Sequence, residues 1–124
     1  MLSVSIWDNG TAAEFSEWLR TQAPRRDPVP ARGCGFLSLT SSRWGGWKSP
    51  ECCVWAGALN HADVDALVAH ACQMEWTVPL AVQLLIMDQE ESFFRLWMFR
   101  DGEFKQYAPL QPDDNDQAFF PADV

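Results

Sequence analysis

Hydrophobic and polar residues alternate in several short segments of the chain, which is the pattern of β-strands with one buried face. Residues 80–87 are apolar on both faces, and this favours a central strand that is covered on each side. The segments that predict strands are 2–7, 35–40, 52–59, 80–87, 93–100 and 103–107. Asp101 and Gly102 separate the last two and predict a tight hairpin turn.

Two other segments place apolar residues at helical intervals of three and four. The first extends from Thr11 to Gln22, and Thr11 with Glu14 has the spacing of a capping box. In the second, Asn60 is the predicted N-cap. Its apolar stripe consists of Val64, Leu67, Val68, Ala71 and Cys72.

These elements follow one another in the order β-α-β-β-α-β-β-β. Two helices packed on one face of an antiparallel sheet of five or six strands make an α+β fold. We expect residues 1–109 to form a single domain and residues 110–124 to form an acidic, proline-containing C-terminal tail. The sheet face that carries Arg95 and Trp97 is expected to be partly open.

The chain has 124 residues, of which 48% are hydrophobic and 21% are charged, as in globular proteins of one domain. Its net charge is −8, and the acidic residues are concentrated in the second half of the chain. Negative charge of this kind repels nucleic acids and attracts basic partners, so we expect no direct nucleic-acid binding. No segment resembles an export signal or a membrane span, and we expect a cytoplasmic protein with free cysteines.

The sequence contains no recognisable catalytic or metal-binding motif. Cysteine pairs with the spacing of a zinc site are absent, and neither His61 nor His70 is placed beside a thiol by its spacing. Carboxylates are abundant, but those in turns stay hydrated and do not suit acid-base catalysis. We therefore expect a binding protein with no cofactor and no metal. Solvation alone is an alternative explanation for the acidic residues.

The seven tryptophans and eight phenylalanines exceed what a small core needs. Phe15, Trp18, Trp55 and Phe94 fall on predicted core faces. Trp44 and Trp47 flank two glycines in a loop, and Trp97 lies beside Arg95, so these three tryptophans are candidates for exposed anchors in an interface.

Three segments together resemble a family of immunity proteins from polymorphic toxin systems, immunity protein family seven. The matching positions are Gly57, Asn60 and His61, then Leu84, Leu85, Asp88, Glu90 and Glu91, then Phe94, Arg95, Trp97 and Gly102. The resemblance implies a cytoplasmic protein that binds a cognate bacterial toxin, often a nuclease or deaminase, and blocks it without turnover.

The charge pattern favours the same function, because an acidic, aromatic surface can dock on a basic active site. The predicted partner-binding residues are Asp88, Glu90, Glu91, Arg95, Trp97, Asp101, Glu103, Trp44 and Trp47. Two alternatives are a small adaptor that binds another host protein and, less favoured, a small-molecule enzyme that uses Cys52 or Cys72 beside a closed cavity.

Overall fold

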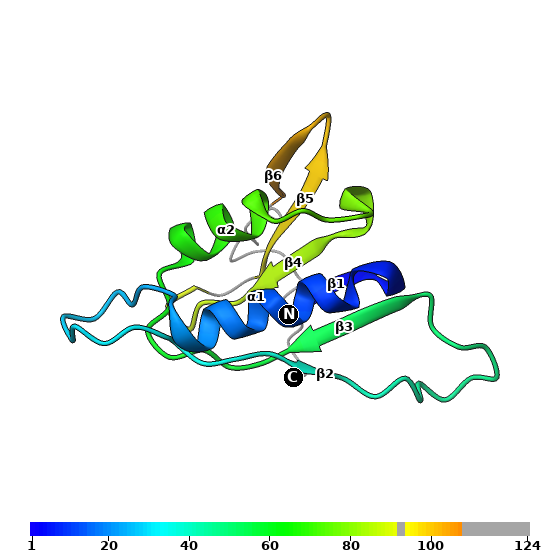
Figure 1. Ribbon diagram of the computed structural model, residues 1–124, viewed down its shortest axis with the longest axis horizontal. Helices are drawn as coiled ribbons and strands as arrows, with labels where there is room; N and C mark the ends of the chain where they lie inside the picture. Colours follow the sequence, from blue (N-terminus) through cyan, green and yellow to red (C-terminus); the bar gives the residue numbers. More distant parts are fainter. Residues whose placement is uncertain (92–93, 108–124) are drawn as a thin grey trace, which may run out of the picture.

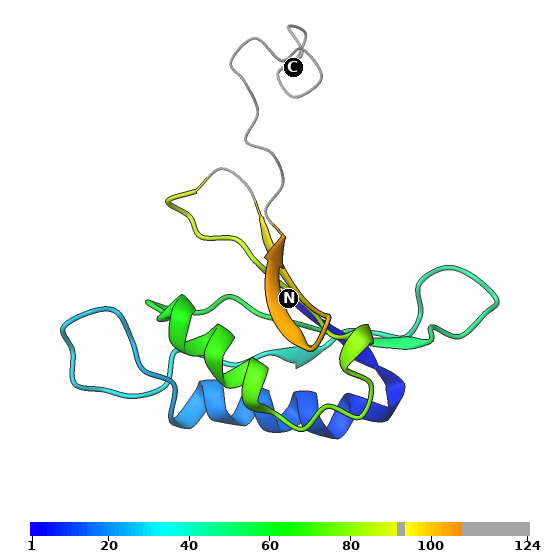
Figure 2. The same ribbon diagram turned by 90° about the horizontal axis from the view of Figure 1, so that it is seen from above.

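A six-stranded antiparallel sheet is covered on one face by two helices in the computed structural model, which describes residues 1–91 and 94–107 (Figures 1 and 2). The strands are β1 (Leu2–Ser5), β2 (Ser38–Leu39), β3 (Cys52–Ala56), β4 (Gln83–Ile86), β5 (Arg95–Arg100) and β6 (Glu103–Tyr107). The helices are α1 (Asn9–Thr21) and α2 (Val64–Gln73), with short 3₁₀ turns η1 (Ile6–Asp8) and η2 (Pro79–Ala81). This arrangement confirms the predicted α+β fold. The predicted tail, 110–124, lies outside the described residues.

The strands are ordered β2-β3-β1-β4-β5-β6, so β1 and β4 form the centre of the sheet. Leu2 of β1 is opposite Trp55 of β3 on one side and Leu84 of β4 on the other. The register continues outward, because Leu84 is opposite Trp97 of β5. The prediction that the apolar segment 80–87 supplies a central strand is confirmed, although its first residues form η2.

The core fills the space between this sheet and the two helices. Paired residues in adjacent strands point to the same face of a sheet, and here that face packs against the helices. The residues with no more than 4% exposure include Leu2, Val4, Phe15, Leu19, Leu67, Val82 and Leu84. The two helices also contact each other through the rings of Trp18 and His70.

The first helix begins two residues earlier than predicted. Asn9 is its first residue, and the proposed capping pair therefore lies inside the helix. Asp8 precedes the helix, but its carboxylate is fully buried and accepts hydrogen bonds from the backbone N–H groups of Thr77 (2.7 Å) and Val78 (2.9 Å). Asp8 therefore fixes the connection between α2 and β4 to the start of α1.

The second helix begins later than predicted, because Asp63, and not Asn60, is its N-cap. The Asp63 carboxylate accepts a hydrogen bond from the Ala66 N–H. The intervening residues are held in a non-helical path, since His61 has a positive φ of 54° and Ala62 forms a β-bridge with Arg25.

The turn at Asp101 and Gly102 is confirmed as a tight hairpin. Both residues have positive φ angles, 55° and 77°, which is the conformation that a two-residue type I′ turn requires. Arg100 and Glu103 are opposite each other on either side of this turn.

The predicted assignment of the two faces of β5 is wrong. Trp97 is only 6% exposed and belongs to the core, whereas Phe94, which was expected in the core, is 51% exposed. The register explains the result, because Trp97 lies opposite the buried Leu84 and hence on the face that the helices cover. The face that the helices leave uncovered carries Leu96 and Met98 in β5.

Candidate binding site

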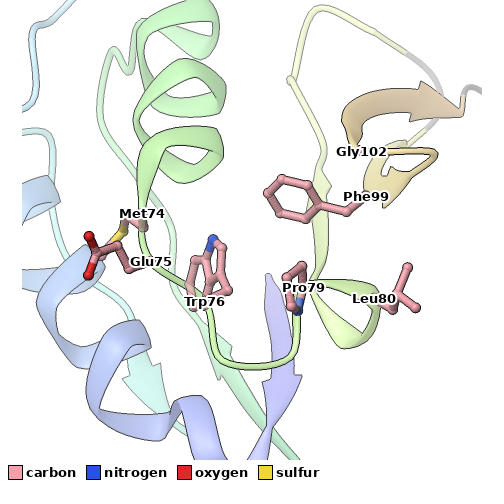
Figure 3. Close-up of a pocket in the computed structure, with 7 residues that line it drawn as sticks. All are labelled: Met74, Glu75, Trp76, Pro79, Leu80, Phe99 and Gly102. Atoms are coloured by element: carbon pink, nitrogen blue, oxygen red, sulfur yellow. The ribbon is translucent and has the colours of Figure 1, made fainter.

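The described residues form at least two hollows. The smaller, of about 440 Å³, lies between the end of α2, η2 and the β5–β6 hairpin. Figure 3 shows Trp76, Pro79 and Phe99 around it, whereas the Leu80 side chain points away. Of the residues on which the resemblance depends, this hollow contains only Gly102.

The larger hollow is a cavity of about 640 Å³ between α1, α2 and the sheet. Part of its lining belongs to the core, because Phe15, Leu19, Leu67 and Leu84 line it and are almost completely shielded from solvent. Both helices and β4 thus supply apolar walls. Its volume falls within the range of about 300–1,000 Å³ that is typical of ligand sites.

Residues that are far apart in the sequence meet around this cavity. The residues of the resemblance that line it are Gly57, Asn60, His61, Leu84, Leu85, Asp88 and Phe94. The first three follow β3, the next two lie in β4, and the last two belong to the β4–β5 connection. The fold therefore brings most of the recognised pattern to one place, and we take this cavity with its rim as the candidate site.

The rim of the cavity consists of three connections that contact one another. The first loop follows α1 and contains Arg26, the second follows β3 and begins at Gly57, and the third follows β4 and contains Asp88. The Arg26 backbone N–H donates to the His61 carbonyl at 2.8 Å, and Asp63 N–H approaches the Pro24 carbonyl at 3.4 Å. Gly57 is required where the second loop leaves β3, because a Cβ there would lie 2.3 Å from the Phe36 carbonyl oxygen. These contacts hold the mouth of the cavity in a defined shape.

An ion pair joins the first and third loops across the rim. The Arg26 guanidinium donates to the Asp88 carboxylate at 2.8 Å, over a separation of 62 residues. This hydrogen bond, followed by one from the Glu90 backbone N–H, lowers the pKa of Asp88 from its ordinary value. The Asp88 side chain is only 11% exposed, so its charge serves the rim itself.

Glu91 is paired in a similar way. Its carboxylate accepts a hydrogen bond from Arg95, whose guanidinium also lies 5.9 Å from the centre of the Trp97 ring. Glu90 differs from both neighbours, because its exposed carboxylate forms no ion pair within residues 1–91 and 94–107. The acidic loop therefore presents one unpaired negative charge, not the three that the sequence suggested.

The other two predicted docking carboxylates lie elsewhere. Asp101 and Glu103 are at the β5–β6 turn, whereas Asp88, Glu90 and Glu91 precede β5, so β5 separates the two groups. Lys105 approaches Asp101 at 3.5 Å and Glu103 at 4.0 Å. The expectation of a single acidic surface is therefore corrected: the five carboxylates form two sites at opposite ends of β5.

The two loop tryptophans are exposed, as predicted. Trp47 is 107% exposed and Trp44 is 53% exposed. They lie in the connection that leads into the start of β3, whereas the cavity lies beyond the end of β3, at Gly57. Trp44 and Trp47 are thus remote from the candidate site, and Figure 2 shows their loop projecting away from the helices.

Two residues of the rim, Arg26 and Met87, were not among the predicted site residues. Arg26 lies in the connection after α1, and Met87, 55% exposed, follows β4 in a segment that was predicted as a strand. Phe94 belongs to the resemblance, but it was expected in the core. No sequence signal joins Arg26 to Asp88, because their pairing depends on the tertiary fold. In the sequence, the alternation of buried and exposed positions ends at a polar turn directly after Met87. That change was the signal that could have identified Met87 as a residue of the rim.

The described residues contain no cluster of three or more histidine, cysteine, aspartate or glutamate side chains that can hold a metal ion. None of the four cysteines lines the cavity. Cys72, predicted on the buried stripe of α2, is exposed, and burial raises the pKa of the Cys34 thiol. The small-molecule enzyme with Cys52 or Cys72 beside a closed cavity thus gains no support.

No family model matches the chain, and neither a curated protein nor a solved structure matches it.

Among the described residues, neither α1 nor α2 has the length and apolar character to cross a membrane.

Proposed function

We propose that this protein is a cytoplasmic immunity protein that binds and neutralises a cognate bacterial toxin, such as a nuclease or a deaminase, without catalysing a reaction. The observation that carries the proposal is the convergence of seven residues of the immunity-protein resemblance on one cavity. These residues come from three separate segments, so their convergence is not a consequence of sequence proximity. An apolar site with few titratable groups is suited to binding and not to turnover.

The rim of the cavity has the composition of a protein-binding surface. Met87 and Phe94 expose large apolar side chains beside the mouth, with Glu90 next to them in the same loop. Apolar anchors surrounded by polar residues are typical of interfaces with proteins. The net charge of −8 accelerates encounter with a basic partner.

The proposal is tested by purifying the tagged protein from its native lysate together with whatever it binds. We expect recovery of one basic toxin domain at equal stoichiometry. The isolated toxin should be active, and adding the protein back at a one-to-one ratio should abolish that activity. Recovery of a non-toxic host protein would instead support the adaptor, and a toxin that stays active in the complex would contradict the proposal.

A further inference from the structure

We infer that the cavity accepts one large apolar side chain of a protein partner, with a lysine or arginine beside it in the partner's sequence that contacts Glu90. This inference rests on the proposed function, which it extends from a class of partner to a mode of recognition. It identifies the cavity as the pocket for an anchor residue and the acidic loop as its charged neighbour.

The apolar lining of the cavity favours an inserted apolar side chain. Phe15 and Leu84 line the cavity and belong to the core, with no more than 2% of their surface exposed, so an inserted group would pack against the outer edge of the core. A ligand that was enclosed by the protein would not need exposed apolar residues outside the mouth. Met87 and Phe94 are exposed there, and they provide area against which the flanks of a protein anchor can pack.

The charges around the mouth favour a cation next to that anchor. Arg26 and Asp88 neutralise each other, as do Arg95 and Glu91. Glu90 carries the remaining negative charge. It acts on the Arg26 guanidinium through space but forms no ion pair among the described residues, and residues 108–124 contain no lysine or arginine. An anionic group would be repelled by Glu90, whereas a lysine or arginine gains an ion pair at the rim.

The inference is tested with a displayed library of short random peptides, selected on the wild-type protein and depleted on Ala62→Phe. Ala62 lines the cavity, and a phenyl group there reduces its volume. We expect the enriched peptides to share a bulky apolar residue adjacent to lysine or arginine. A synthetic peptide of that consensus should bind both Ala62→Phe and Glu90→Lys about tenfold more weakly or worse.

Glu75→Lys is the matched control, because it makes the same charge change at the smaller hollow. It should leave peptide affinity within about twofold of the wild type. If Ala62→Phe fails to fold, as judged by its melting curve, Glu90→Lys decides alone, since Glu90 is exposed. The inference would be overturned if no enriched peptide depended on the cavity. It would also be overturned if the basic residue of the enriched peptides could be replaced without loss of affinity.

The library contains no toxin, so the two proposals can fail separately. Failure of the peptide selection would leave a captured and inhibited toxin in place as evidence for the proposed function. Conversely, enrichment of the expected peptides without any toxin in the lysate would remove the proposed function and retain the recognition mode.

Discussion

Trp18 of α1 and His70 of α2 stack face to face, with ring centroids 3.8 Å apart and ring planes inclined by 3°. Phe15 lies beside both rings, with its centroid 6.0 Å from that of Trp18 and 6.2 Å from that of His70. The stack is the principal aromatic contact between the two helices. Burial lowers the pKa of His70, so the neutral imidazole is the form that the folded state favours.

Replacing His70 with glutamine should therefore reduce stability in a pH-dependent way. At pH 7.5 the loss should be about 0.5–1.5 kcal/mol, the value of an aromatic pair. Because the unfolded histidine binds a proton near pH 6.5 more readily than the folded one, the wild type loses stability as the pH falls below about 6.5. Urea unfolding at pH 7.5 and 5.5 should show the two proteins converging, and a constant difference would contradict the assignment.

The ion pair between Arg26 and Asp88 makes a separate prediction. In Arg26→Gln the pKa of Asp88 should rise, because its strongest stabilising hydrogen bond is lost. Carbon-detected NMR titration of the carboxyl groups measures this directly. The wild type should lose its stability advantage over the variant as the pH falls from about 3.9 through the folded pKa of Asp88, where that carboxylate becomes protonated.

Arg32→Gln is the control for that titration, because within residues 1–91 and 94–107 the Arg32 side chain makes a 3.4 Å contact with the Gln22 carbonyl and none with Asp88. It should leave the Asp88 titration curve in place. An unchanged Asp88 pKa in Arg26→Gln would show that the ion pair does not form in solution.

Ser16 connects α1 to the segment before β2. Its hydroxyl donates to the Leu37 carbonyl at 2.8 Å and accepts from the Leu37 N–H at 2.9 Å. Ser16→Ala should lower the free energy of unfolding by about 1–3 kcal/mol, because it leaves buried backbone groups without partners. Chemical denaturation measures the loss. Thr21→Ala, which removes an exposed hydroxyl from the same helix, should cost less than Ser16→Ala.

Truncation to alanine should affect stability strongly at Trp97 and only slightly at Trp47. Trp97→Ala removes a buried ring from the core and should cost about 3–5 kcal/mol. Trp47→Ala should change stability by no more than about 0.5 kcal/mol, since that ring is exposed. Thermal unfolding of the two variants gives the comparison, and equal losses would contradict the reversed faces of β5.

The sequence predicted the elements of the fold better than their faces. The Asp101-Gly102 turn and the succession of helices and strands along the chain were predictable because each depends on local chemistry. The faces of β5 were not, because Leu96 and Met98 are apolar like Trp97, so alternation alone does not identify the buried side. Pairing of Trp97 with Leu84 decides it, and that pairing depends on register across the sheet.

The candidate site was predicted in part. Asp88 and Glu90 were identified from their turn, but the cavity beneath them needs both helices, and a short sequence pattern does not contain that information. Arg26 was missed because its partner lies 62 residues away. The same contact explains why the folded protein presents less unpaired negative charge at this turn than the sequence suggests.

The position of β1 between β3 and β4 has a consequence for biosynthesis. Leu2 leaves the ribosome before the two strands that flank β1, which end at Ala56 and Ile86. The nascent chain therefore cannot complete these central pairings until Ile86 has emerged. Until then its apolar residues are open to chaperones and to aggregation. The centre of the sheet should therefore form only after β4 has left the ribosome.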